Sequence, residues 1–330
     1  MKYTDFYEPA AERYTRMQYR YCGKSGLRLP AMAFGLWHNF TISSSYENCR
    51  RLILGAFDLG INHFDLANNY GPVPGTSEKI FGEILKADLS EHRDELVIST
   101  KAGYDMWEGP YGTGGSKKYL IASLDQSLRR MGLDYVDIFY HHRPGPETPM
   151  EETAEALEQI VRQGKALYVG ISNYSPKQTA QMEGILRDKG LHCLIHQLRF
   201  SMLDQENLPA IREAERLSIG TIAFCPLAQG LLTDKYLNGI PEDSRAAGHS
   251  RFFGKEQITE EALARVRALN DLAGQRGQSL AQMALAWNLG RNTSVILGAS
   301  RIEQLQENVR ALDNLDFTEE ETARIEEILK

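Results

Sequence analysis

The stretch VDIFYHHRPGPETPMEETAEALEQIVRQGKALYVGI, residues 136–171, contains the pattern that decides the fold. Its apolar run Val136–Tyr140 predicts a buried strand, and apolar residues spaced three and four apart over Met150–Gln163 predict a helix. Gly164 follows that helix, as glycine commonly does at helix C-termini, and Ala166–Ile171 predicts the next strand. Two strands joined by a helix form a β-α-β unit, in which the strands run parallel.

The same alternation of strands and helices continues on both sides of this unit. Apolar runs predict eight strands, which are Met32–Gly35, Asn62–Leu66, Leu96–Thr100, Val136–Tyr140, Ala166–Ile171, Leu194–Gln197, Thr221–Phe224 and Ser294–Gly298. Apolar spacing predicts the intervening helices Tyr46–Leu59, Ser77–Ala87, Tyr119–Met131, Met150–Gln163, Pro176–Asp188 and Leu208–Leu217. Eight such units in one chain predict an α/β fold in which a parallel sheet closes into a (β/α)8, or TIM, barrel.

The remaining residues predict additions to the barrel. A chain of 330 residues could hold two domains of average size, but one decorated barrel also accounts for this length. We expect a hairpin formed by Met17–Tyr21 and Leu27–Pro30, and a long loop over Gly239–Gly254 after the seventh strand. Helices are also expected at Glu260–Gln275, Ser279–Asn288, Arg301–Leu312 and Glu320–Leu329. The expected organisation is an N-terminal arm, residues 1–16, followed by a single barrel domain, residues 17–330.

Composition argues against several classes of protein. Hydrophobic residues make up 42% of the chain and charged residues 25%, a globular balance that argues against disorder. The net charge of −7 disfavours binding to nucleic acid, and no stretch approaches the ~20 apolar residues of a membrane-spanning helix. The N-terminus has no apolar run, so no signal peptide is expected. The cysteines are widely separated, which favours reduced thiols in a cytoplasmic protein and neither a disulfide framework nor a metal site.

A doubly wound parallel sheet is the rival α/β fold. That fold binds dinucleotides through a Gly-x-Gly-x-x-Gly motif that opens its first helix, and no such motif occurs in this sequence. The glycine-rich segment Gly112–Gly115 does not directly follow a predicted strand, and Gly23-Lys24-Ser25 only resembles the end of a phosphate-binding loop. Both segments are interpreted as turns, so the barrel is favoured.

Residues that follow the predicted strands are the candidates for catalysis, because barrel enzymes carry their active sites at the C-terminal ends of the strands. Asp65 and Tyr70 lie at the second strand, Lys101 at the third and His142 at the fourth. Lys101 is expected to lower the pKa of the Tyr70 phenol from its ordinary value near 10, and Asp65 to hold Lys101 in place. Tyr70 could then donate a proton to a carbonyl oxygen as a hydride arrives, with a second hydrogen bond from His142.

These residues lie in motifs that resemble the aldo-keto reductase superfamily. The resemblance covers the chain from about Tyr19 to Leu329, and its motifs are FDLANNYG (64–71), STK (99–101), GISNY (170–174), PLAQGLLTDKY (226–236) and LGAS (297–300). The likeness is to the branch that includes the β-subunits of voltage-gated potassium channels and bacterial glyceraldehyde 3-phosphate reductases. It implies that the four candidates form a catalytic tetrad. His141 would then pack away from the site, because neighbouring residues on a strand face opposite sides.

The resemblance also implies a cofactor, NADP(H), that extends across the mouth of the barrel. Ser172, Asn173 and Gln197 would hold the nicotinamide amide. Contacts are also implied for Trp37, Asp65, Phe224, Cys225, Pro226, Leu227, Ala228, Gln229, Lys235, Arg245, Gly298, Ser300, Gln304, Glu307 and Asn308. Arg245 lies among other basic residues of the long loop, which favours NADP over NAD because the additional phosphate is anionic. Phe200 is expected to stack under the nicotinamide ring, where many relatives have a tyrosine.

Aromatic residues of the loops predict a pocket for a small aldehyde. Its expected lining is Trp37, Tyr70, Tyr104, Trp107 and His142. The resemblance suggests short aldehydes such as L-glyceraldehyde 3-phosphate or methylglyoxal as substrates, and Arg143 or Arg20 could contact a substrate phosphate. It also suggests a homo-oligomer, a tetramer or larger.

Other functions remain open on the same barrel. A cofactor-binding regulatory subunit that senses redox state is one, but the channel β-subunits have an asparagine where this chain has His142, which favours catalysis. A metal-dependent hydrolase would need histidine and carboxylate ligands on successive strands, and no such set is present. An aldolase acting through a Schiff base would need an uncharged Lys101, which the neighbouring Asp65 and Tyr70 oppose.

Overall fold

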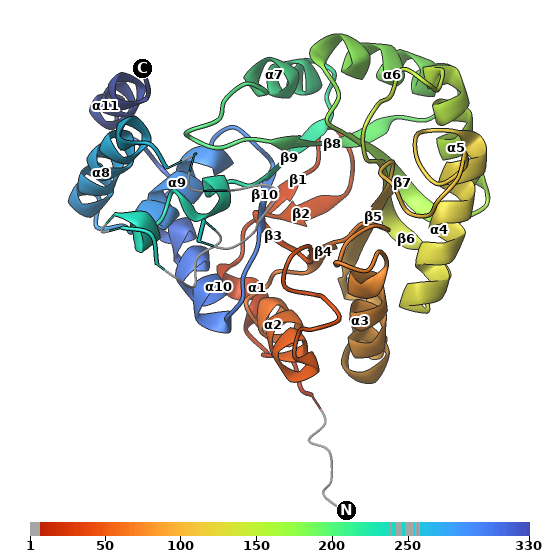
Figure 1. The fold of residues 1–330 in the computed structure, drawn as a ribbon, viewed down its shortest axis with the longest axis horizontal. Helices are drawn as coiled ribbons and strands as arrows, with labels where there is room; N and C mark the ends of the chain where they lie inside the picture. Colours follow the sequence, from red (N-terminus) through yellow and green to blue (C-terminus); the bar gives the residue numbers. More distant parts are fainter. Residues whose placement is uncertain (1–6, 238, 242–245, 248–253, 255, 257) are drawn as a thin grey trace, which may run out of the picture.

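The computed structural model of the protein describes residues 7–237, 239–241, 246–247, 254, 256 and 258–330. Eight parallel strands close into a barrel, which confirms the predicted fold (Figure 1). Each strand pairs with the next along the chain, and the last pairs with the first, with Val295 opposite Met32. The strands are β3 (Met32–Gly35), β4 (His63–Asp65), β5 (Val97–Ala102), β6 (Val136–His141), β7 (Ala166–Ser172), β8 (Cys193–Arg199), β9 (Gly220–Phe224) and β10 (Ser294–Leu297).

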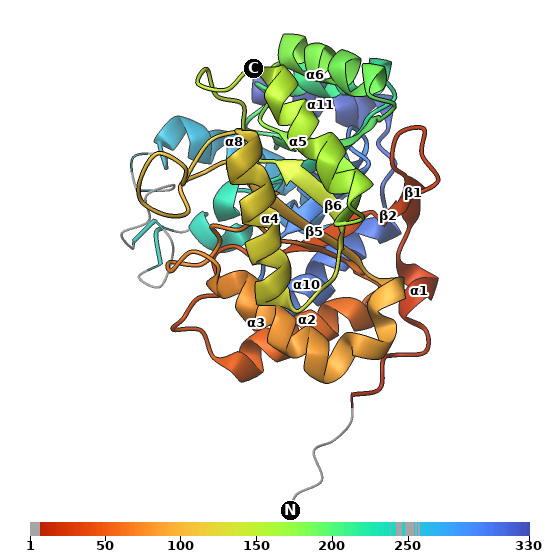
Figure 2. The ribbon, with the colours of Figure 1, turned by 90° about the vertical axis from the view of Figure 1, so that its right-hand side faces the viewer.

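Helices cover the outside of the barrel, close to the predicted ranges (Figure 2). They are α2 (Tyr46–Asp58), α3 (Thr76–Ile84), α4 (Lys117–Met131), α5 (Met150–Arg162), α6 (Pro176–Asp188), α7 (Leu208–Arg216), α8 (Glu260–Gln275), α9 (Leu280–Leu289), α10 (Ile302–Val309) and α11 (Glu319–Leu329). Two predicted helices change type before they end. The first continues beyond α3 as a π-helical turn at Leu85–Leu89, and the second continues beyond α10 as a 3-10 turn at Arg310–Asp313.

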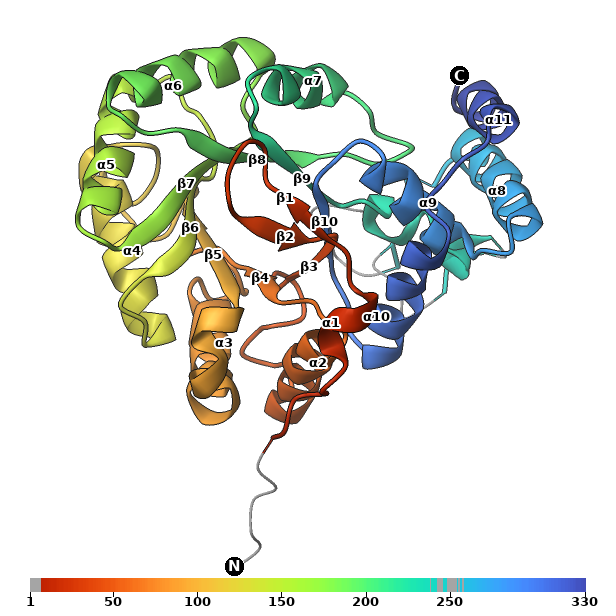
Figure 3. The same ribbon diagram turned by 180° about the vertical axis from the view of Figure 1, so that it is seen from behind.

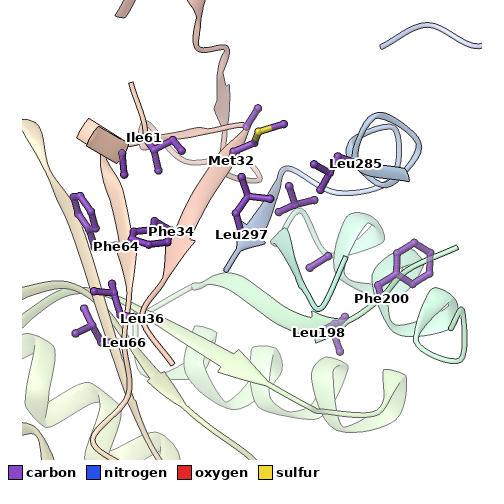
Figure 4. Close-up of a cluster of buried hydrophobic side chains, with 14 of the residues drawn as sticks. Met32, Phe34, Leu36, Ile61, Phe64, Leu66, Leu198, Phe200, Leu285 and Leu297 are labelled. Atoms are coloured by element: carbon purple, nitrogen blue, oxygen red, sulfur yellow. The ribbon is translucent and has the colours of Figure 1, made fainter. Parts of the chain in front are cut away.

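Alternation along each strand divides its side chains between two cores. On β3, Met32 and Phe34 point outward into the apolar layer between strands and helices, together with Leu36 just beyond the strand (Figure 4). Ala33, between them, belongs to the smaller cluster inside the barrel. Because successive residues of a strand face opposite sides, this parity decides which residues of every strand reach the barrel interior.

The N-terminal hairpin closes one end of the barrel. Strands β1 (Tyr19–Tyr21) and β2 (Arg28–Pro30) pair antiparallel, and the hairpin lies across that end in the view from behind (Figure 3). Leu29 is fully buried and packs with the side chains inside the barrel. The turn of the hairpin requires Gly23, since its φ is +56° and a Cβ there would lie 2.1 Å from the carbonyl oxygen of Ser218. The hairpin therefore seals the end of the barrel opposite the C-terminal ends of the strands.

The segments at the two ends of the chain pack against the barrel helices. In the N-terminal arm, which includes the short helix α1 (Arg13–Arg16), Tyr7 donates to Asp58 at the end of α2, at 2.8 Å. Helix α11 lies beside α8, and Arg276 pairs with Glu321 between them (Figure 1). Among the described residues, no helix combines the length and apolar character that crossing a membrane requires.

Truncation of Leu29 tests the sealing role of the hairpin. We expect Leu29→Ala to lower the free energy of unfolding by about 2–5 kcal/mol, because it leaves a cavity among fully buried side chains. Urea-induced unfolding would measure the change. Leu167→Ala is the matched control, since Leu167 is 51% exposed and its truncation should cost less than about 0.5 kcal/mol. Equal losses in the two variants would contradict the role.

Candidate active site

The open end of the barrel brings polar side chains from successive strands into one cluster. Asp65 lies at the end of β4, Lys101 near the end of β5, Ser172 at the end of β7 and Gln197 on β8. Strand parity aims these side chains into the barrel, and residues of this kind at C-terminal strand ends form the active sites of barrel enzymes.

Lys101 and Asp65 form a buried ion pair at the centre of this cluster. The Lys101 Nζ lies 2.6 Å from Asp65 Oδ2 and donates to the carbonyl oxygen of Leu66 at 2.7 Å. Lys101 is fully buried and Asp65 is 2% exposed. Burial lowers the pKa of Lys101, and the carboxylate of Asp65 opposes this change. The other oxygen of Asp65 accepts hydrogen bonds from Ser99 Oγ at 2.8 Å and from Gln197 Nε2 at 3.0 Å.

Ser99 and His63 support the ion pair from deeper in the barrel, and the sequence-based candidates did not include them. Ser99 donates to Asp65, so its oxygen is left to accept from His63 Nε2 at 3.0 Å. Burial lowers the pKa of His63 to about 4, which keeps the imidazole neutral. Ser99 lies two residues before Lys101, hence on the same face of β5, and that spacing was the signal available in the sequence.

Tyr70 lies beside the ion pair, at the mouth of the barrel. The Lys101 Nζ is 5.0 Å from the centre of the Tyr70 ring, and the Trp37 ring stacks on Tyr70 at 5.9 Å. The expected net lowering of the Tyr70 pKa by the neighbouring Lys101 is not found in this structure. Burial raises that pKa well above its ordinary value, and the charge of Asp65 raises it further. Tyr70 is therefore a neutral phenol at neutral pH, and it keeps the proton that it would donate.

His142 faces Tyr70 from the end of β6. The two ring centres are 6.0 Å apart, and Tyr104 lies edge-on to the His142 ring at 4.6 Å. Burial lowers the pKa of His142 well below its ordinary value, as does the positive charge of Lys101. A neutral imidazole can donate one hydrogen bond, so His142 and Tyr70 can both act as neutral donors to one oxygen atom.

His141 points to the other side of β6, as expected. Its Nδ1 lies 2.6 Å from the hydroxyl of Tyr174, and the backbone N–H of Tyr174 donates to His196 Nε2 at 3.2 Å. Burial lowers the pKa of both histidines to about 3. Both are therefore neutral packing residues behind the site.

The backbone is strained at the expected nicotinamide and pyrophosphate contacts. Five described residues other than glycine have positive φ, and four of them are Asn173, Cys225, Ala228 and Gln229. Such conformations cost roughly 1–3 kcal/mol each and gather at ligand sites. The side chain of Asn173 donates to the carbonyl oxygen of His142 at 3.0 Å, which ties this turn to the catalytic candidates. Pro226 and Leu227 lie within the same strained segment.

The residues expected around the adenosine lie just before and along α10. Gly298, Ser300, Gln304 and Glu307 are exposed there, and Asn308 is 6% exposed. Gln304 Oε1 accepts from the backbone N–H of Ser300 at 2.8 Å, so this side chain caps the helix. Lys235 is exposed in a 3-10 turn after β9. Arg245 lies outside the described residues.

Phe200 does not lie under the nicotinamide position, and that expectation is wrong. It is fully buried and stacks on Trp287 of α9, with ring centres 5.5 Å apart. Strand parity explains the error, because Gln197 points into the barrel and the residue three positions later points out. Phe224, at the end of β9, packs against the interior cluster and is only half buried, so its ring belongs to the mouth of the barrel.

Two further expectations can be compared with the structure. Arg20 cannot contact a substrate at the mouth, because it lies in the hairpin at the other end of the barrel and donates to the carbonyl oxygen of Leu289 at 2.7 Å. Trp107 lies outside the aromatic cluster that is formed by Trp37, Tyr70, Tyr104 and His142. Its ring packs on Tyr119 of α4 at 5.2 Å.

Tyr119 links two loops of the mouth and was missed from the sequence. Its hydroxyl accepts from Asn68 Nδ2 at 3.0 Å and donates to the carbonyl oxygen of Tyr104 at 2.5 Å. Asn68 belongs to the turn that carries Tyr70, and Tyr104 contacts His142. The Tyr119 hydroxyl therefore connects the turn that carries Tyr70 with the loop whose Tyr104 contacts His142.

Comparison with known proteins identifies the family. The profile of the Aldo/keto reductase family matches residues 31–330. The chain belongs to the aldo/keto reductase family. It is therefore an oxidoreductase, and members of this family generally use NAD(P)H.

Individual relatives fall into the branch that the motifs suggested. L-glyceraldehyde 3-phosphate reductase of Escherichia coli (strain K12) is 58% identical over 323 residues, which cover 96% of this chain and 93% of that protein. A probable voltage-gated potassium channel subunit beta of Oryza sativa subsp. japonica is 33% identical over 328 residues, covering 95% of this chain and 97% of that protein. A probable voltage-gated potassium channel subunit beta of Arabidopsis thaliana is 35% identical over 309 residues, covering 90% of this chain and 92% of that protein.

The buried histidines predict loss of stability in mild acid. His63, His141 and His196 have folded pKa values of about 4, 3 and 3, whereas the unfolded value is near 6.5. The unfolded chain binds more protons below that value, so each histidine should cost about 1.4 kcal/mol of stability per pH unit as the pH falls below about 6.5. Urea unfolding at pH 7.5, 6 and 5 would measure the slope. His196→Gln should reduce the slope of stability against pH by the contribution of one histidine, about 1.4 kcal/mol per pH unit. An unchanged slope would contradict the prediction.

Removal of the Tyr119 hydroxyl should weaken the mouth of the barrel. We expect Tyr119→Phe to lower the free energy of unfolding by about 1–3 kcal/mol and reductase kcat/KM by roughly tenfold, because the two loops lose their shared bond. Steady-state kinetics and urea unfolding would measure both effects. Tyr21→Phe is the control, because Tyr21 is 65% exposed on the hairpin. Full activity in Tyr119→Phe would exclude the positioning role.

Proposed function

We propose that this chain is an NADPH-dependent reductase of small aldehydes, such as L-glyceraldehyde 3-phosphate or methylglyoxal, with Tyr70 as the proton donor. The observation that carries the proposal is the position of a neutral phenol between the His142 ring and the buried Lys101–Asp65 pair. The proposal includes a cytoplasmic setting, which the separated cysteines of the sequence favour.

The reaction requires a hydride donor and a proton donor on the same carbonyl group. When bound, the reduced nicotinamide supplies the hydride to the carbonyl carbon. Tyr70 donates its proton to the carbonyl oxygen, which gains negative charge as the hydride arrives. His142 donates a second hydrogen bond to this oxygen and orients the substrate, and the positive charge of Lys101 stabilises the phenolate left on Tyr70.

Several features of the mouth fit a nicotinamide dinucleotide. Phe224 presents a half-buried ring beside the interior cluster, and the positive-φ turns at Asn173 and Cys225 have the strain that is typical of ligand sites. Ser172 and Gln197 are buried nearby, with amide and hydroxyl groups suited to a carboxamide. The preference for NADP over NAD depends on Arg245 and its basic neighbours, and it stays a prediction.

The substrate class is supported by the relatives and by the aromatic cluster. The Escherichia coli protein, 58% identical to this chain, bears the name of a reductase of L-glyceraldehyde 3-phosphate. Trp37, Tyr70, Tyr104 and His142 form a connected aromatic cluster at the mouth, a lining that suits a short aldehyde.

A regulatory subunit is the second candidate, because two relatives carry names of channel subunits. Those relatives resemble this chain less, and the sequence resemblance places an asparagine at their position equivalent to His142. The presence of an imidazole beside Tyr70 favours catalysis here. The expected homo-oligomer, a tetramer or larger, is common to both candidates and does not separate them.

Removal of the Tyr70 hydroxyl tests the proposal. We expect Tyr70→Phe to lower kcat/KM for aldehyde reduction by about 10²- to 10⁴-fold, the typical contribution of a general acid, while NADPH still binds. NADPH oxidation over a panel of short aldehydes measures the first quantity, and NADPH fluorescence on binding measures the second. The control is Tyr111→Phe, because Tyr111 is 55% exposed in the neighbouring loop.

Two outcomes would overturn it. Unchanged turnover in Tyr70→Phe would exclude this phenol as the acid. Tight NADPH binding by the unaltered protein with no turnover of any aldehyde would instead support the regulatory function.

A further inference from the structure

Arg143 is a half-buried cation beside the catalytic candidates, and the proposed reaction leaves it without a role. It follows His142 directly in the chain, and its guanidinium lies 4.8 Å from the centre of the Tyr104 ring. The same Tyr104 ring contacts His142 edge-on at 4.6 Å. A single aromatic ring therefore separates the guanidinium from the imidazole.

Most of the hydrogen-bonding capacity of Arg143 is unused within the protein. Its Nε donates to the carbonyl oxygen of Gly103 at 3.2 Å, and its Nη2 reaches Thr113 Oγ1 only at 3.5 Å. The Nη1 has no acceptor among the described residues. A guanidinium carries five N–H donors, so a fork of donors remains available.

No carboxylate of the described part of the chain neutralises this charge within 4.0 Å. Some other partly buried arginines do have such partners, for example Arg13 with Glu95 and Arg93 with Asp137. Glu147 lies four residues further along the same loop, with its carboxylate against Gly114, and does not pair with Arg143. A half-buried arginine that stacks on an aromatic ring and lacks an acidic partner is well suited to bind an anion with two parallel hydrogen bonds.

We propose that Arg143 binds the phosphate of a phosphorylated aldehyde substrate and so selects triose phosphates over uncharged aldehydes. This inference rests on the proposed function. The guanidinium of Arg143 and the imidazole of His142 both contact the Tyr104 ring, whose centre lies 4.8 Å from the guanidinium and 4.6 Å from the centre of the imidazole. A short molecule can therefore place its carbonyl oxygen at His142 and Tyr70 and its phosphate at Arg143.

Two other roles predict different behaviour. If Arg143 only positions the loop of Gly103, its loss should impair all aldehydes equally. If it binds the pyrophosphate of the cofactor, its loss should weaken NADPH binding. Specific recognition of the substrate phosphate predicts neither effect.

The test compares glyceraldehyde 3-phosphate with unphosphorylated glyceraldehyde, which has the same reacting carbonyl group. We expect Arg143→Ala to lower kcat/KM for the phosphorylated aldehyde by about 10- to 100-fold, the usual cost of losing a charge-assisted hydrogen bond. The value for glyceraldehyde and the Kd of NADPH should each change by less than about threefold. Arg143→Lys should recover part of the loss, because it restores the charge without the planar fork. Arg129→Ala, on the exposed face of α4, is the control.

Binding of inorganic phosphate gives a readout that does not depend on turnover. Calorimetric titration of the NADPH-loaded protein should give a Kd that rises about tenfold in Arg143→Ala. Equal losses for both aldehydes, a weakened NADPH Kd, or unchanged phosphate binding would each overturn the inference. Absence of turnover by the unaltered protein, with phosphate binding still dependent on Arg143, would overturn the proposed function and leave the anion site in place.

Discussion

The buried ion pair of Lys101 and Asp65 connects three strands at the centre of the site. A charged pair loses its hydration when it is buried, and the loss is offset only if its remaining donors and acceptors are satisfied. Here the Leu66 carbonyl accepts from Lys101, while Ser99 and Gln197 donate to Asp65. Strands β4, β5 and β8 therefore meet at one carboxylate. Removal of either charge would leave the other buried without a partner, which typically lowers the free energy of unfolding by about 3–5 kcal/mol.

This pair also determines what the neighbouring groups can do. Burial keeps the proton of Tyr70 in place, and the carboxylate of Asp65 further opposes ionisation of this phenol. His142 is kept neutral by the same burial and by the positive charge of Lys101. The result is a pair of neutral donors beside a fixed cation, an arrangement in which negative charge is stabilised only when it develops on a bound oxygen.

Much of the barrel and of its site could be predicted from the sequence, because both follow from short-range patterns. Apolar runs defined the strands within a few residues, and the residues after them were brought together as expected. Phe200 was misplaced because only the register of β8 determines which way it points. The pKa of Tyr70 was predicted in the wrong direction, because burial outweighs a cation 5.0 Å from the ring centre. Tyr119 was missed because its role depends on where α4 sits against two loops.

The side chains inside the barrel form layers that become more polar from the hairpin to the mouth. The inward residues are Ile138 and Tyr140 on β6, with His142 just beyond it, and Val97, Ser99 and Lys101 on β5, in that order from the hairpin to the mouth. The lowest layer is mostly apolar, with His63 opposite Val97, and the buried Leu29 of the hairpin packs against the side chains inside the barrel. The charged layer above it is therefore held in a medium of low dielectric constant, where hydrogen bonds and charges act strongly. In a barrel open at both ends, water would reach the ion pair and weaken its electrostatic effect on Tyr70. The hairpin therefore contributes to the chemistry, although it lies at the end of the barrel opposite the site.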